Sequence, residues 1–202
     1  RLGDHEAAVS ALQTVLRSAP DSSAAWEALG AAYDALNRHS AALKAYGRAI
    51  DIERERTTNS IDDPGGGVFA SVRSGRIMHQ MGAVRESIAA YEHALAVAPG
   101  HTAALLGLAE AELGRARLAA GRGAPGVAIA AAERAAEAAT RSSLSTGTDA
   151  PKRTAVKLIG DAAMVVARCR DPSLAIAPAR EERDAVASEA SKPSAAAEYA
   201  AR

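Results

Sequence analysis

The chain has few aromatic residues and almost no cysteine. Only 3% of its 202 residues are Phe, Trp or Tyr, and Cys169 is its single cysteine. One cysteine forms no internal disulfide and supplies no structural zinc site by itself, which favours a reducing compartment. Because 48% of the residues are hydrophobic and these are largely alanine, the chain can build thin seams between helices but no thick globular core.

The chain also lacks an excess of charge of either sign. Its 24 basic and 24 acidic residues balance, so no overall field would draw it to nucleic acid or to an anionic membrane. It contains no apolar run of the roughly 18 residues that suggest a membrane span. No stretch alternates apolar and polar residues as a strand would. The sequence therefore predicts an all-α protein, with no direct binding of nucleic acid or membrane.

A pattern of spaced residues, Trp-x-x-Leu-Gly-x-x-Tyr, occupies positions 26–33. It predicts two antiparallel helices, because small residues are needed where they cross and large ones around the crossing. The defining residues of this unit are Trp26, Leu29, Gly30, Tyr33, Ala42, Tyr46 and Ala49. The pattern resembles the tetratricopeptide repeat, a two-helix unit of about 34 residues, and places one repeat at 23–56.

The same period recurs on both sides of this unit. Residues 1–22 fit the second half of a truncated repeat, and we expect the chain to be a piece of a longer array. After a predicted surface loop at 57–67, another repeat fits 68–101. Its defining residues are Gly75, Gly82, Tyr91, Ala94 and Pro99.

The register is weaker in the second half of the chain. Residues 102–141 fit a degenerate, extended repeat, with Leu105 and Leu108 in its Trp and Leu positions. A loop is predicted at 142–152, and the first helix of a further unit at 153–170, with Gly160 in the glycine position. The tail at 171–202 is rich in alanine, serine and charge and is expected to be partly disordered or helical. The fold predicted is a right-handed superhelix, an α-solenoid of about four to five units.

Three features suggest chemistry, and each has a simpler explanation. The glycines of G-x-G-x-x-G at 121–126 follow a predicted helix and not the strand that a dinucleotide site needs, so they indicate a helix-breaking loop. His93 and His101 are predicted to face solvent, since no third ligand has metal-binding spacing. Cys169 is predicted to be a partly buried structural thiol. We therefore predict no catalytic, cofactor-binding or metal-binding residues, and no cofactor.

The first helices of such repeats line a concave face that holds partner proteins. The candidate residues on this face are Glu27, Asp34, Arg73, Arg76, His79, Gln80 and Glu110. Their signs are mixed, so they are either partner contacts or only solvated positions. A clamp for a C-terminal carboxylate would need Lys and Asn one turn apart on the first helix, where Glu27 and Ala31 stand. This argues against a chaperone-tail clamp.

The order of the units resembles the tetratricopeptide-repeat scaffold subunits of superkiller complexes. The resembling segments are 25–30 with 41–44, 68–91, 103–110 and Val-Lys-Leu-Ile-Gly-Asp-Ala at 156–162. The resemblance implies a cytoplasmic, or also nuclear, scaffold that holds an RNA helicase and β-propeller subunits and assists the exosome in 3′-to-5′ mRNA decay. A generic repeat adaptor or assembly factor, bacterial or organellar, remains the alternative. In both cases we expect a non-catalytic protein.

Overall fold

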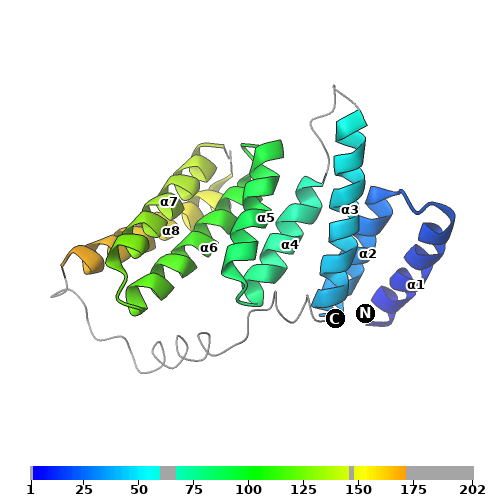
Figure 1. Cartoon of the computed structure of the whole chain (residues 1–202), viewed down its shortest axis with the longest axis horizontal. Helices are drawn as coiled ribbons and strands as arrows, with labels where there is room; N and C mark the ends of the chain where they lie inside the picture. Colours follow the sequence, from blue (N-terminus) through cyan, green and yellow to red (C-terminus); the bar gives the residue numbers. More distant parts are fainter. Residues whose placement is uncertain (1, 60–66, 146–147, 172–202) are drawn as a thin grey trace. The chain divides into compact units, whose positions relative to one another are not determined.

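The computed structural model describes residues 2–59, 67–145 and 148–171. Within these ranges the chain forms eight α-helices and no strand (Figure 1), which confirms the all-α prediction. The helices are α1 (Leu2–Ser18), α2 (Ser23–Ala35), α3 (His39–Asn59), α4 (Val68–Gln80), α5 (Val84–Val97), α6 (Thr102–Gly121), α7 (Pro125–Ser145) and α8 (Asp149–Arg170). None of them is long and apolar enough to cross a membrane.

The chain divides into two compact units. The first comprises Arg1–Ile77 and Ala89–Pro99, and the second comprises Met78–Ile88 and Gly100–Arg202. In the first unit, α2 packs against α3 and also against α1. Val9 and Leu16 of α1 are buried against Trp26 and Tyr33 of α2. The aromatic residues of the repeat pattern therefore join one helix pair to the helix before it.

Three turns between paired helices share one backbone signal for ending a helix. Asn37, Gly82 and Gly123 follow α2, α4 and α6 with positive φ angles of 55°, 77° and 71°. Glycine adopts this conformation without steric cost, and asparagine tolerates it. After each of them, the next residue donates its N–H to the carbonyl oxygen five positions back, as in a Schellman motif. These bonds are Arg38 to Tyr33 (2.8 Å), Ala83 to Met78 (2.8 Å) and Ala124 to Ala119 (2.9 Å).

The G-x-G-x-x-G segment belongs to one of these turns. Helix α6 precedes it and ends at Gly121, and α7 begins at Pro125. Gly123 supplies the left-handed residue of the turn, and proline is favoured in the first turn of a helix because its missing N–H is not needed there. The segment acts as a helix break, as its position after a helix indicated.

Small residues set the distance between the paired helices of the first unit. A Cβ atom added to Gly30 would lie 2.6–2.9 Å from three ring carbons of Tyr46 on α3, and one added to Gly75 would lie 2.9–3.0 Å from Tyr91 on α5. Tyr46 is fully buried and Tyr91 nearly so. Only a glycine lets the aromatic ring approach the backbone this closely, so each Gly–Tyr contact fixes one helix pair.

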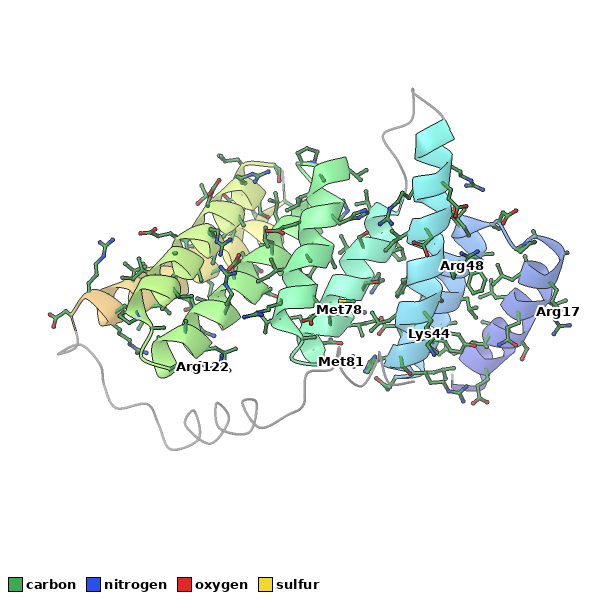
Figure 2. The ribbon with its side chains drawn as sticks, viewed as in Figure 1. Arg17, Lys44, Arg48, Met78, Met81 and Arg122 are labelled. Atoms are coloured by element: carbon green, nitrogen blue, oxygen red, sulfur yellow. The ribbon has the colours of Figure 1, made fainter. Side chains whose placement is uncertain are left out.

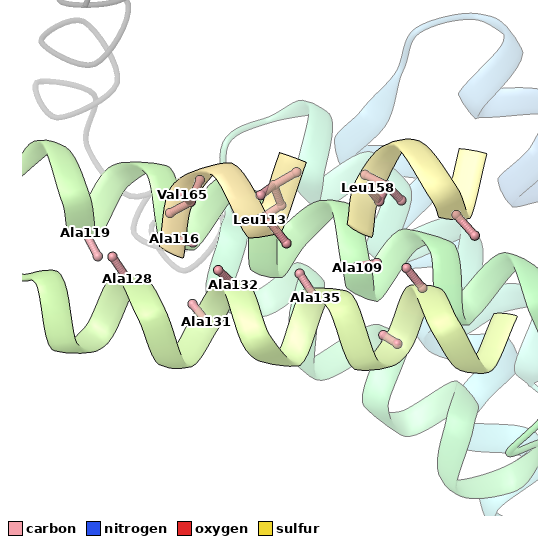
Figure 3. Packing of buried hydrophobic residues seen from close by; sticks show 14 residues of the cluster. Ala109, Leu113, Ala116, Ala119, Ala128, Ala131, Ala132, Ala135, Leu158 and Val165 are labelled. Carbon is pink, nitrogen blue, oxygen red and sulfur yellow. The ribbon is translucent and has the colours of Figure 1, made fainter. Parts of the chain in front are cut away.

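The second unit is held together mainly by alanine. Helices α6, α7 and α8 pack against one another, and their shared core contains small side chains with few larger ones (Figure 3). Its buried residues are Ala109, Leu113, Ala116, Ala119, Ala128, Ala131, Ala132, Ala135, Ala138, Ala139, Ala155, Leu158, Ala162 and Val165. Alanine at successive turns lets the helix backbones approach closely, which compensates for the small apolar area of each residue.

This seam should not tolerate larger side chains. Ala135 on α7 has no exposed surface, so we expect Ala135→Leu to cost about 1–3 kcal/mol of unfolding free energy through overpacking. Ala130→Leu on the same helix is the matched control, because Ala130 is exposed and its replacement should change stability by less than about 0.5 kcal/mol. Urea unfolding followed by circular dichroism measures both. Equal effects would contradict the close packing of the seam.

Two predicted loops are partly helical, so their boundaries were wrong. Helix α7 continues to Ser145 and α8 begins at Asp149, inside the loop predicted at 142–152. The Thr140 and Ser143 hydroxyls donate to carbonyl oxygens one turn back, at 2.7 Å each, so these polar residues are compatible with the helix. Pro151 is tolerated in the first turn of α8 because the N–H groups there have no partner within the helix.

Helix α3 also continues further than predicted. It runs through Asn59, so the first three residues of the loop predicted at 57–67 are helical. Arg56, near this end, donates to the Asp21 carbonyl oxygen (2.9 Å) and to Ser23 Oγ (3.3 Å), which ties the end of α3 to the start of α2. Residues 60–66 of that loop, and the tail from 172 to 202, lie outside the described residues.

Candidate partner-binding surface

Helices α2 and α4 bring together four of the seven predicted surface residues, Glu27, Asp34, Arg73 and Arg76. The Arg76 guanidinium forms an ion pair with the Asp34 carboxylate, and His39 Nδ1 lies 3.8 Å from the same carboxylate. Part of the predicted charge is therefore neutralised inside the protein. We call this surface, with Phe69 added, the α2–α4 face.

Phe69 is an exposed aromatic residue on this face that the sequence analysis missed. It keeps 44% of its surface exposed, and its ring forms a T-shaped pair with the Tyr46 ring, at a centroid distance of 6.5 Å and an interplanar angle of 73°. The Arg73 guanidinium lies over the Phe69 ring, 5.1 Å from its centroid. The two residues are four positions apart on α4, which places them on one side of the helix. This four-residue spacing was the feature of the sequence from which the Phe69–Arg73 pair could have been predicted.

The Arg73 guanidinium contacts the Phe69 ring and, within the described residues, is not paired with a carboxylate. Within the described part of the chain Arg73 forms no ion pair, so its guanidinium keeps donors for an outside acceptor. A cation over an exposed aromatic ring contributes only about 0.5–1 kcal/mol. The pair therefore offers a flat apolar surface beside an available positive charge.

Glu27 sits partly buried at the base of the face. Burial raises the pKa of its carboxyl above the usual value, a hydrogen bond from the backbone of Ala70 opposes this, and the charge of Glu53 raises the pKa further. The ionised carboxylate is thus less well accommodated here than in water. A hydrogen-bond donor supplied by a partner would relieve that cost.

Tyr46 lies beneath the face with its hydroxyl buried, and among the described residues this hydroxyl has no hydrogen-bond partner. Burial raises its pKa to about 12, Asp34 adds to the shift, and the charges of Arg73 and Arg76 oppose it. The ring is needed at the Gly30 crossing. Packing of the ring at this crossing therefore places the hydroxyl where no described residue forms a hydrogen bond with it. Tyr46 supports the face from below and is not itself accessible.

The remaining predicted surface residues, His79, Gln80 and Glu110, lie in the second unit. His79 packs against α6, since its Cε1 atom is 3.7 Å from the position of a Cβ on Gly114. Gln80 and Glu110 are exposed. The seven predicted residues therefore fall in two units. The ion pair and the ring contacts reported above belong to the α2–α4 face.

The histidines and the cysteine have structural contacts. His93 Nδ1 and Ser71 Oγ share a hydrogen bond of 3.0 Å between α5 and α4, and His101 Nδ1 accepts from the Ala104 N–H at 3.2 Å, which caps α6. Both histidines are half-buried, so they face solvent only in part, and their contacts among the described residues are structural. Cys169 packs, partly buried, against the alanine core. Among the described residues no three of His, Cys, Asp and Glu gather where they could hold a metal.

Comparison with known proteins identifies the class of one segment. Residues 23–56 match the tetratricopeptide repeat family. This segment covers α2 and most of α3, including the Gly30–Tyr46 contact. Repeats of this family indicate a scaffold for protein–protein interaction and are typically non-catalytic.

Longer similarity extends to particular proteins. Over 113 residues the chain is 28% identical to Superkiller complex protein 3 of Homo sapiens and of Mus musculus, and to Tetratricopeptide repeat protein 37 of Xenopus laevis. The match covers 56% of this chain but 6% of each relative, so the chain spans only a small part of their length.

Solved structures that match the chain include MamA and PilW. The MamA crystal structure is 18% identical, with a TM-score of 0.49 over 82% of this chain and 91% of that chain. PilW, a widely conserved type IV pilus biogenesis factor, is 16% identical, with a TM-score of 0.32 over 92% of this chain and 91% of that chain.

Proposed function

We propose that this chain is a non-catalytic scaffold segment of a superkiller-type complex. In that role it binds protein partners in the cytoplasm, or also in the nucleus, and assists exosome-mediated 3′-to-5′ mRNA decay. The observation that supports this is the 113-residue similarity to Superkiller complex protein 3. The expected partners are an RNA helicase and β-propeller subunits, with the exosome engaged indirectly, and the helicase performs the chemistry.

The α2–α4 face is the part of the chain that we propose for a partner contact. Phe69 provides an aromatic anchor, Arg73 provides a guanidinium with no carboxylate partner in the described residues, and Glu27 provides a carboxylate disfavoured by burial. A matching partner segment carries an apolar side chain, an acidic group and a donor. Since the helices hold these groups in place before binding, less conformational freedom is lost on assembly.

Affinity purification of the full-length parent protein from its own cells, followed by mass spectrometry, tests both the superkiller role and the α2–α4 face as a contact site. We expect an RNA helicase, a β-propeller protein and exosome components among the recovered proteins. We expect Phe69→Ser/Arg73→Ser to reduce recovery of one direct partner at least about tenfold, since aromatic and arginine anchors dominate interface energies.

The matched control is Lys44→Ser/Arg48→Ser, which removes two exposed side chains on α3 (Figure 2). It should leave recovery unchanged. If only unrelated proteins were recovered, we would conclude that the chain belongs to a generic adaptor. If the Phe69→Ser/Arg73→Ser variant recovered the expected partners at the wild-type level, the α2–α4 face would not be a partner contact.

A further inference from the structure

The buried side of α7 is nearly uniform. Its buried residues are all small, and they are Ala128, Ala131, Ala132, Ala135, Ala138, Ala139 and Ser142. The larger residues of the same core, Leu113, Leu158 and Val165, belong to α6 and α8. These residues meet small side chains wherever α7 lies along its axis, so packing by itself specifies the position of α7 only weakly.

A slide of α7 by one turn would preserve this buried side. Four residues correspond to about 6 Å along a helix axis. Each buried alanine would be replaced by the residue four positions later, and these residues are Ala132, Ala135, Ala136, Ala139, Ser142 and Ser143. Unwinding the first turn of α7 would lengthen the connection at 122–124 by the amount required. A second register of α7 is therefore compatible with the alanine core.

The exposed charges of α7 also fit this second register. In the observed register Glu133 Oε1 lies 3.6 Å from Arg170 Nη2 of α8, and the slide would put Glu137 in the place of Glu133. A slide in the opposite direction would put Arg134 in the place of Ala138, which is 3% exposed, and so would bury its charge. Of the two one-turn slides, the first is therefore the one that competes with the observed structure.

Glu112 of α6 distinguishes the observed register from the second one. Its carboxylate is buried, since only 1% of the residue is exposed, and its Oε1 lies 3.4 Å from Arg134 Nε. In the second register Ala138 takes the place of Arg134. Glu112 then keeps Arg115 of its own helix, whose Nη2 is 2.7 Å from Oε2, but loses its arginine from α7. Removing one partner from a buried ionic group is strongly destabilising.

We infer that the ion pair between Glu112 and Arg134 sets the register of α7 against α6. The alanine core accepts two positions of α7, and the buried carboxylate selects one of them. A single buried polar residue fixes register in the same way in coiled coils, whose apolar seams are also repetitive. A change of register would move the exposed side of α7 by one turn, so any partner that contacts this side depends on the pair.

Moving the arginine by one turn tests this inference. In Arg134→Ala/Ala138→Arg, the second register returns an arginine to Glu112, whereas the observed register would bury an arginine at position 138. We therefore expect α7 to slide by one turn, while the helicity measured by circular dichroism stays unchanged.

Double electron–electron resonance between two spin labels measures the slide. The labels are attached to Ala120→Cys and Thr140→Cys in a chain that also carries Cys169→Ala. Both labelled positions are exposed. Ala120 is next to the turn between α6 and α7, and Thr140 is near the far end of α7. Because the slide carries residue 140 toward that turn, we expect the distance between the labels to shorten by about 6 Å.

Ala130→Arg is the matched control. It adds an arginine one turn from Arg134 at an exposed position and leaves Arg134 in place, so the distance between the labels should not change. An unshifted distance in Arg134→Ala/Ala138→Arg would overturn the inference, and so would a shifted distance in the control.

A second variant decides the question if the relocated arginine prevents folding. Glu112→Ala/Arg115→Ala/Arg134→Ala removes all three charges, so neither register buries an unpaired charge. We expect two distances between the labels, about 6 Å apart. A single distance equal to that of the unaltered sequence would show that packing alone sets the register, and would overturn the inference. Neither test depends on the superkiller proposal.

Discussion

Gly30→Leu is expected to unfold the α2–α3 pair. Even the first carbon of the new side chain would lie 2.6–2.9 Å from the Tyr46 ring, and Tyr46 is fully buried, so the ring cannot move aside into solvent. We expect a loss of about 3 kcal/mol or more, at the upper end of overpacking effects. A unit of marginal stability would not survive this. Helicity by circular dichroism and the urea midpoint are the measurements.

Gly47→Leu is the control for this experiment. Gly47 lies in α3 of the same pair, and nothing is within 4 Å of a Cβ placed there. Leucine should stabilise the helix by up to about 1 kcal/mol, because glycine is a poor helix former. The two variants thus introduce the same side chain with opposite expected signs. If they gave equal melting curves, the helix crossing would not depend on Gly30.

Loss of both arginines around Glu112 should destabilise the second unit. Glu112 on α6 is only 1% exposed. Its Oε2 lies 2.7 Å from Arg115 Nη2, and its Oε1 lies 3.4 Å from Arg134 Nε on α7. Replacing both arginines by leucine leaves the buried carboxylate without these charges, which typically costs about 3–5 kcal/mol. Urea unfolding of Arg115→Leu/Arg134→Leu measures the loss.

Removing the carboxylate as well should restore much of the stability. Adding Glu112→Leu to that double variant exchanges the whole ionic group for apolar residues, and such exchanges are often neutral or stabilising. Recovery of most of the lost free energy would show that the cost comes from burying the Glu112 carboxylate without its two arginines. A triple variant as unstable as the double one would show that side-chain shape, and not charge, is responsible.

The repeat pattern predicted the helix pairs well where a crossing constrains the sequence. The spacing placed Gly30 and Ala42 where the helices cross and Tyr46 around that crossing, because a close crossing needs small residues. The direct contact of each glycine with a tyrosine ring, Gly30 with Tyr46 and Gly75 with Tyr91, came from the structure. Helix ends were predicted less well. Polar residues at 142–145 were predicted as a loop, but the Ser143 and Ser145 hydroxyls donate to carbonyl oxygens within α7. Whether such a segment forms helix or loop depends on which of its residues become buried.

The candidate surface was predicted in part for a similar reason. Helical spacing placed Glu27, Asp34, Arg73 and Arg76 on first helices, but it could not say that Asp34 and Arg76 would neutralise each other. It also gave no prominence to Phe69. The exposure of an aromatic residue depends on what its neighbours cover, and that information is not local to α4.

The class of fold and the two-helix unit at 23–56 could thus be predicted from the sequence, because both follow from the period of the helix and the size of side chains. The pairing of charges and the burial of Glu112 between arginines emerged from the three-dimensional packing. So did the ring packed against Gly30, which has no counterpart at Gly160 within the described residues. Burial and pairing depend on residues far apart in the chain. A glycine in the same pattern can thus contact a ring in one helix and contact none of the described side chains in another.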